Sequence, residues 1–384
     1  MKALQDYSFI RGFCYPGGAF KPEEQIRREL GYAKRLELNS TRIWLSERKY
    51  REDPRSFIEQ LMSFVRIAYE LGITVMPVLF NGNGLDPADL EEDYRPKGDE
   101  YTNAVVNALK DEPGLIMWDI MNEPSCNDYI IKSPPDERAE RWDKINGFVR
   151  YYCNLLRGLD PVNAVTIGHT YIGDAEPTVD LVDIISFHDY LPTRRRIEAS
   201  YIEAAKLSKK TRKPMINNEL CCLCRGNPYD LALDICREYN TGWYLFELMI
   251  SGYWSDVHGI FYPDGTVRDP SIPAAVMGFS RNRSAGGYVL PNANKEGHAQ
   301  KAIEMVKDAL QDNREVFIGK TKPIEEILEA AEYCANLLEC CELVPMYNPP
   351  TRQIEIIRES GNVTEAQRLA YSLAKALEEA CMLL

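Results

Sequence analysis

Two acidic side chains stand where short apolar runs end, and their types suit acid–base chemistry. Glu123, preceded by Asn122, follows one such run, and Glu219 closes another. One carboxylic acid that donates a proton and one carboxylate that attacks carbon or activates water form the pair that cleaves a glycosidic bond. The sequence therefore predicts this chemistry if the fold brings the two carboxyl groups to one site.

Three further polar residues lie in or after other apolar runs. Arg42 is part of one run, and His188 and Tyr190 follow another. A cation, an imidazole and a phenol would thus accompany the two carboxylates if the fold brings them to the same site. Each also has a purely structural interpretation, as an ion-pair partner or as a buried polar group without a part in catalysis.

Eight short apolar runs alternate with amphipathic stretches and must position these groups. Such runs are typical of strands that are covered on both faces. They span Phe9–Cys14, Thr41–Leu45, Thr74–Phe80, Leu115–Met121, Ala164–Gly168, Asp183–Phe187, Pro214–Asn218 and Gly242–Leu248. The pattern predicts an α/β fold, a (β/α)8 TIM barrel whose catalytic groups stand at the C-terminal ends of the strands. A doubly wound sheet is the competing fold, but no G-x-G-x-x-G turn follows the first run.

The pattern changes near residue 290. We expect residues 1–290 to form the catalytic barrel and residues 291–384 to form a C-terminal helical extension, with apolar stripes at helical spacing. Thr364-Glu-Ala-Gln367 predicts a capping box at the start of its last helix. The extension is expected to dock on the barrel or to form a subunit contact, so a homo-oligomer is possible.

Composition excludes several classes of partner. A net charge of −13 argues against binding to nucleic acid. The longest apolar run, Ile73–Phe80, is too short to cross a membrane. The N-terminal residues lack the apolar segment of a signal peptide, and the 11 cysteines do not suggest a disulfide framework. We therefore expect a cytoplasmic protein.

These motifs together resemble glycoside hydrolase clan A, and within it family 5, which includes cellulases, mannanases and β-mannosidases. The resemblance rests on Asn122-Glu123-Pro, His188-x-Tyr190 and Glu219, and covers roughly Phe9 to Gly278. It implies a retaining double displacement, with Glu123 as acid/base and Glu219 as nucleophile. Asn122 would then bind the 2-hydroxyl of the sugar. Arg42 and Tyr190 would hold the ionised carboxylate of Glu219, and His188 would line the site near Glu123. The charge of Glu219 should raise the pKa of Glu123.

Aromatic side chains are candidates for the floor of the sugar site. The family usually places a Trp in a stretch like G-W-x-x-W-E, where this chain has Gly242-Trp-Tyr-Leu-Phe-Glu. Either Phe246 takes that position or Trp243 serves in a shifted register. Trp44 and Trp254 are further candidates, and each of these aromatics could equally be core. The polar segment from Asn81 to Asp89 could wall the cleft or be a solvated loop.

The expected substrate is a short intracellular β-linked oligosaccharide, cleaved in an exo fashion. A β-mannosidase is the first expectation and a β-glucosidase the second. A β-galactosidase, an endo-acting mannanase or glucanase, and a non-catalytic sugar-binding barrel remain as alternatives. No cofactor or metal is expected, because the C-x-x-C at Cys221–Cys224 has no partner pair and the four histidines form no H-x-H or H-E-x-x-H.

Overall fold

The computed structural model describes the chain apart from residues 1–2, 223–225, 279–294, 315–323, 341–349 and 384. The chain divides into two compact units, Met1–Ser280 and Arg281–Leu384. The domain boundary expected at residues 290 and 291 lies outside the described residues.

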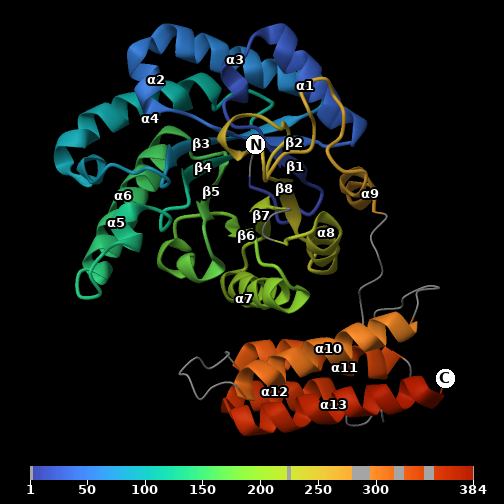
Figure 1. Ribbon diagram of the computed structural model, residues 1–384. Helices are drawn as coiled ribbons and strands as arrows, with labels where there is room; N and C mark the ends of the chain where they lie inside the picture. Colours follow the sequence, from blue (N-terminus) through green and yellow to red (C-terminus); the bar gives the residue numbers. More distant parts are fainter. Residues whose placement is uncertain (1–2, 223–225, 279–294, 315–323, 341–349, 384) are drawn as a thin grey trace. The chain divides into compact units, whose positions relative to one another are not determined.

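The first unit is built on eight parallel strands that close into a barrel in chain order, with β8 pairing with β1 (Figure 1). The strands are β1 Arg11–Cys14, β2 Ser40–Trp44, β3 Thr74–Asn81, β4 Met117–Asn122, β5 Ala164–His169, β6 Ile185–Asp189, β7 Met215–Leu220 and β8 Gly242–Leu245. Each of the eight apolar runs overlaps one of these strands. The predicted (β/α)8 barrel is thereby confirmed.

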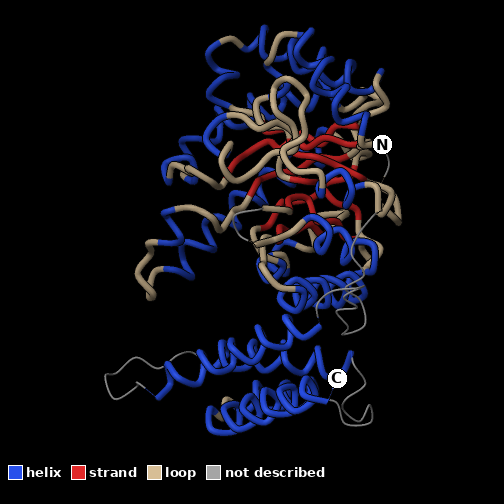
Figure 2. Tube along the Cα trace, turned by 45° about the vertical axis from the view of Figure 1, so that its right-hand side comes forward, coloured by secondary structure: helices blue, strands red, loops and turns tan. Residues whose placement is uncertain are grey.

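Helices surround the strands, as the tube in Figure 2 shows. The α-helices are α1 Glu23–Arg35, α2 Glu47–Glu52, α3 Pro54–Glu70, α4 Arg95–Leu109, α5 Asp128–Ile131, α6 Arg138–Leu159, α7 Arg194–Thr211, α8 Tyr229–Glu238 and α9 Ser271–Val276. Helix α3 illustrates why the sequence starts a helix where it does. The Asp53 side chain accepts a hydrogen bond from the Ser56 N–H at 3.0 Å, and Pro54 fixes φ in the first turn.

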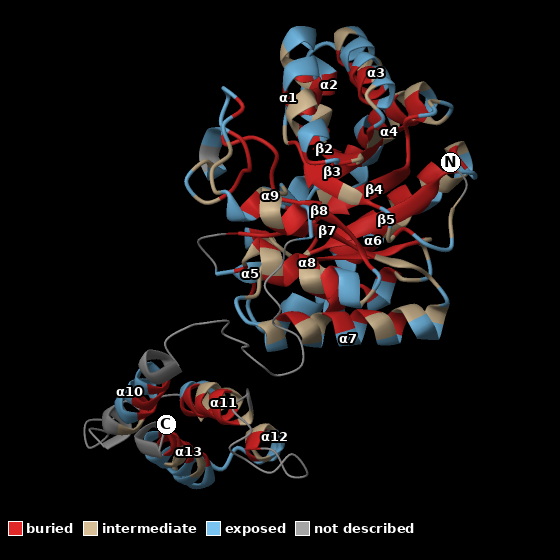
Figure 3. Cartoon of the chain, turned by 90° about the vertical axis from the view of Figure 1, so that its right-hand side faces the viewer, coloured by how far each residue is buried: buried red, intermediate tan, exposed pale blue. Residues whose placement is uncertain are grey.

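Alternation along the strands sorts their side chains into two cores, and the strands are almost wholly buried (Figure 3). In β8, Tyr244 belongs to a cluster in the barrel interior, as does Phe246 just beyond the strand. Trp243 and Leu245 belong instead to the larger cluster that strands and helices share. Because successive residues of a strand face opposite sides, the same rule decides which side chains reach the barrel mouth.

The second unit is helical and has a hydrophobic core of its own. It contains α10 Lys295–Arg314, α11 Ile324–Cys340, α12 Pro350–Ser360 and α13 Val363–Leu383. The expected capping box at Thr364 is wrong, because Asn362 caps α13 by accepting from the Glu365 N–H at 3.2 Å. Of the helices that the structure describes, none has the length and apolar character to span a membrane.

Candidate active site

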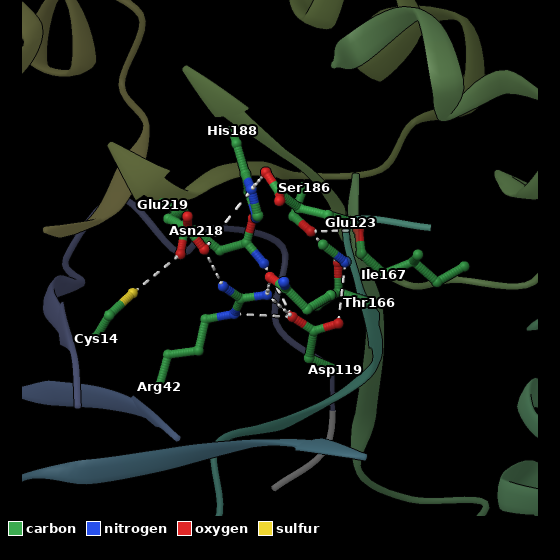
Figure 4. A network of polar contacts seen from close by, with 12 residues as sticks. Cys14, Arg42, Asp119, Glu123, Thr166, Ile167, Ser186, His188, Asn218 and Glu219 are labelled. Carbon is green, nitrogen blue, oxygen red and sulfur yellow. Dashed lines mark hydrogen bonds and ion pairs between the residues drawn. The ribbon is translucent and has the colours of Figure 1, made fainter. Parts of the chain in front are cut away.

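Glu123 and Glu219 come together at the C-terminal end of the barrel, from β4 and β7 (Figure 4). The Nδ1 atom of His188 lies 2.8 Å from Glu123 Oε1 and 3.7 Å from Glu219 Oε2. One ligand atom from each of the three side chains lies within 4.8 Å of the other two. Carboxyl groups about 5–5.5 Å apart suit direct attack by one of them on an anomeric carbon, and a greater distance would leave room for water.

The backbone at Glu123 is unusual. Its φ of 46° lies in the left-handed region that side-chain-bearing residues rarely adopt. The conformation is held by a hydrogen bond from the Glu123 N–H to Gly168 O at 2.6 Å, and by one from the Cys126 N–H to Glu123 O at 3.0 Å. Strained residues of this kind cluster at functional sites, where the surrounding structure over-determines them.

Arg42 organises the floor of the site. It is fully buried, and its Nη1 donates to Glu219 Oε2 at 2.8 Å while its Nη2 donates to Asn122 Oδ1 at 2.8 Å. Its Nε donates to Asp119 Oδ2 at 3.0 Å. A buried guanidinium requires such compensation, and the fork geometry lets one cation orient three acceptors. The expected pairing of Arg42 with Glu219 is present.

Asp119 is a site residue that sequence reasoning missed. Its carboxylate also accepts from the Gly168 N–H at 2.9 Å and from Asn218 Nδ2 at 3.0 Å, so it ties β4 to β5 and β7. The available signal was an acidic residue inside an otherwise apolar run, since a buried carboxylate needs a cation.

Tyr190 donates a hydrogen bond from its hydroxyl to Glu219 Oε1 at 2.7 Å. Burial, followed by the negative charge of Glu219, raises the pKa of the Tyr190 phenol well above its usual value. The phenol therefore stays a donor across the physiological pH range. Glu219 thus accepts from Arg42 through one oxygen and from Tyr190 through the other.

The electrostatics of Glu123 differ from the expectation. Burial raises the pKa of this carboxyl, but hydrogen bonds from His188 and Asn83 and the charge of Arg42 outweigh it and lower the pKa to about 2. The prediction of a raised pKa was wrong because it considered only Glu219. Asn83 Nδ2, which donates to Glu123 Oε2 at 2.7 Å, was not singled out from the sequence.

The segment after β3 reaches the site, as one of its two interpretations required. Asn122 Nδ2 donates to Asn81 Oδ1 at 2.9 Å, so both ends of the Asn122 amide are engaged. The Gly82 N–H donates to Asn122 O at 2.6 Å. Loop and strand are therefore fastened together beside the candidate acid/base.

Among the aromatic candidates, the structure separates Phe246 from Trp243. Phe246 lies at the mouth end of the barrel interior, its ring 5.9 Å from that of Trp44 at 88°. The Arg42 guanidinium carbon lies 4.4 Å from the centre of the Trp44 ring. Trp243 packs on the helix side of β8 and does not reach the site. Trp254 is 44% exposed and has its ring 6.0 Å from that of His258.

Glu123, His188 and Glu219 are also the described residues whose donor atoms lie close enough to share a metal ion. In this structure the His188 Nδ1 is engaged by Glu123. Of the C-x-x-C segment, Cys221 and Cys222 form no disulfide, and Cys224 lies outside the described residues.

Comparisons with known proteins agree with the barrel fold. A mannanase from Rhizomucor miehei shares the fold at 14% identity and a TM-score of 0.57, over 71% of this chain and 94% of that one. A Streptomyces cattleya GH5_18 protein in complex with Manβ1-4GlcNAc shares the fold at 15% identity and a TM-score of 0.55, over 70% of this chain and 78% of that one. A search of curated proteins found no match. The family Cellulase (glycosyl hydrolase family 5) matches residues 24–245, more than half of the sequence. The chain therefore belongs to glycosyl hydrolase family 5, a family of retaining glycoside hydrolases in clan A.

Proposed function

We propose that the protein is an exo-acting β-glycosidase of short β-linked oligosaccharides, with Glu123 as acid/base and Glu219 as nucleophile. The observation that carries the proposal is the single imidazole, His188, that lies between the two carboxyl groups, 2.8 Å from one and 3.7 Å from the other. These two carboxyl groups are sufficient for double displacement, because both steps of the reaction use the same acid/base and the same nucleophile.

In the first step, a Glu219 oxygen bonds to the anomeric carbon as the bond from that carbon to the leaving oxygen breaks. The Glu123 proton goes to the leaving oxygen. In the second step, Glu123 takes a proton from water, the water oxygen bonds to the anomeric carbon, and the bond to Glu219 breaks. Arg42 and Tyr190 hold Glu219 in place for attack and stabilise its charge when it leaves.

We place β-mannosides first among the substrates and β-glucosides second. Two observations support this order: two similar structures are endo-1,4-β-mannanases, and one similar protein is bound to Manβ1-4GlcNAc. A cytoplasmic location is part of the proposal. Cys14 and Cys153, which are buried and form no disulfide, support it. Substrates there would be imported oligosaccharides rather than polymers.

A panel of p-nitrophenyl β-glycosides (mannoside, glucoside, galactoside, xyloside) tests the reaction. We expect the mannoside to be the best substrate, with retention of anomeric configuration by NMR. The E219Q variant should lose at least about 10³-fold in kcat, since removing a nucleophile removes the covalent route. E238Q changes an exposed carboxyl on α8 and is the matched control. A wild type that binds sugars yet hydrolyses none of the panel would contradict the proposal.

Exo action is tested separately with mannohexaose. We expect mannose and mannopentaose as the first products in a time course resolved by chromatography. Early accumulation of mannobiose and mannotriose, with little monosaccharide, would instead indicate an endo-acting mannanase.

A further inference from the structure

A third carboxyl group, that of Glu247, lies within reach of the charge of Glu219 and has no part in the reaction described above. Glu247 follows β8 directly after Phe246, and only 6% of it is exposed. No hydrogen bond or ion pair joins its carboxyl to another residue that the structure describes. A buried acid without partners is costly and calls for an explanation.

The position of Glu247 relative to Glu123 and Glu219 decides which part of a bound substrate its carboxyl could contact. Of the two catalytic carboxylates, Glu219 is the one whose charge raises the pKa of Glu247. The charge of Glu247 in turn acts to raise the pKa of Cys14 in the barrel interior. The leaving group must lie toward Glu123, on β4. The ring that Glu219 attacks therefore extends away from β4, toward the strands that follow β7 around the barrel.

We propose that Glu247 is a specificity-determining residue that binds hydroxyl groups of the sugar ring attacked by Glu219. This inference rests on the proposed function. A carboxylic acid offers one O–H donor and a carbonyl acceptor, and this pair matches two neighbouring hydroxyls of a pyranose. The ligand supplies the partners that the described protein does not, and an analogue lacking those hydroxyls would leave the acid unpaired.

The surroundings keep Glu247 in the form that this role needs. Burial, and then the charge of Glu219, raises the pKa of Glu247 to about 8, although Lys21 and Arg268 act to lower it. The charge of Glu247 also acts to raise the pKa of two other groups, Cys14 on β1 and Tyr229 on α8. Near neutral pH the group is thus a neutral acid. Ionisation above pH 8 would remove its donor and set a second negative charge beside Glu219.

The test compares E247Q and E247A with wild type on p-nitrophenyl β-D-mannopyranoside, from pH 5 to 10. Gln keeps one donor and one acceptor but cannot ionise. We expect E247A to lose at least about tenfold in kcat/KM. E247Q should stay within about threefold near pH 6.5 and should lose the decline of kcat/KM that wild type shows above pH 8.

The matched control is D189N. Asp189 is also buried, and burial raises its pKa to about 6, but it faces Tyr201 and Cys236 on the helix side of β6. Asn keeps the acceptor for the Leu191 N–H, so the alkaline decline should remain in this variant. An E247A protein that folds and keeps wild-type kcat/KM, or an E247Q protein with an unchanged alkaline decline, would overturn the inference.

Calorimetric titration with 1,4-β-mannobiose separates this inference from the proposed function. If wild type binds the sugar but turns over no glycoside, the proposed function fails. Binding at least about tenfold weaker in E247A would then still support the role of Glu247, and equal binding would refute it. Absence of any sugar binding by wild type would refute both.

Discussion

At Glu123, hydrogen-bond donors stabilise the ionised form of a carboxyl group that must be protonated to serve as the proposed acid. Asn83 Nδ2 donates to one carboxyl oxygen at 2.7 Å, and His188 Nδ1 lies 2.8 Å from the other. The glycosidic oxygen of a bound substrate must take the place of one of these partners. Asn83 lies in the loop after β3, whereas His188 is buried in β6, so the amide is the partner that a substrate would displace.

Replacing Asn83 with Ala should raise the pKa of Glu123, because one donor to its charged form is lost. The limb of the kcat/KM profile that follows ionisation of Glu123, which is distinct from the decline above pH 8 that follows Glu247, should then move up by about one pH unit for a phenyl β-glycoside, the worth of one hydrogen bond to a charged group. A dinitrophenyl glycoside, whose leaving group needs no proton, should show no such shift. Superimposable profiles of N83A and wild type on the phenyl substrate would refute the role of Asn83. N107A, an exposed amide on α4, is the control.

The two carboxyl groups that come together at the barrel mouth could be singled out from the sequence because each ends an apolar run, but their surroundings could not. Asn83 and Asp119 contact residues that lie far from them in the chain, and Glu247 lies within reach of the charge of Glu219 on another strand. The pKa of Glu123 depends on the sum of those contacts, so a single neighbour such as Glu219 was a poor guide to it. Local patterns identify reactive groups, and tertiary contacts set their charge.

At the scale of elements, the close packing of the loop after β3 against the end of β4 requires glycine at position 82. A Cβ placed on Gly82 would lie 2.0 Å from Glu123 O and 2.8 Å from Asn122 O, both backbone atoms that cannot yield easily. We expect G82A to lose at least tenfold in kcat/KM and about 1–3 kcal/mol in the free energy of unfolding. Kinetics and urea denaturation measure the two effects.

The control for Gly82 is Gly31 in α1, where a Cβ would meet nothing within 4 Å. Ala at this helical position should leave kcat/KM unchanged and stabilise the unit by about 0.5–1 kcal/mol, since Gly is entropically costly in a helix. Equal losses of activity in G82A and G31A would show that the loop is not fastened as described.

The strands were predicted well because buried parallel strands are continuous apolar runs, but their ends depend on the barrel. The first run was expected from Phe9, yet β1 begins at Arg11, and Phe9 is half exposed. The last run was expected to continue to Leu248, but β8 ends at Leu245. In the same element, alternation places Phe246 inside and Trp243 outside, a distinction that needs the register of β8 as well as its sequence.

For the whole molecule, two separate hydrophobic cores imply that each unit has its own free energy of unfolding. The barrel's larger core includes Leu61 of α3, and the helical unit's core includes Leu328 of α11; both leucines are fully buried. Nothing in the described helical unit belongs to the candidate active site. The units should therefore unfold in two transitions, and a single free energy of unfolding would not describe the chain.

Scanning calorimetry of the full chain tests this with one cavity in each core. L328A should cost the helical unit about 2–5 kcal/mol and lower its transition by about 10 °C or more, because a small unit loses several degrees per kcal/mol. Glycoside hydrolysis below that transition should be unchanged. L61A should instead lower the other transition and shorten the lifetime of activity on heating. One shared transition that both variants lower together would mean that the cores unfold cooperatively, and the division of stability argued from their separate packing would be wrong.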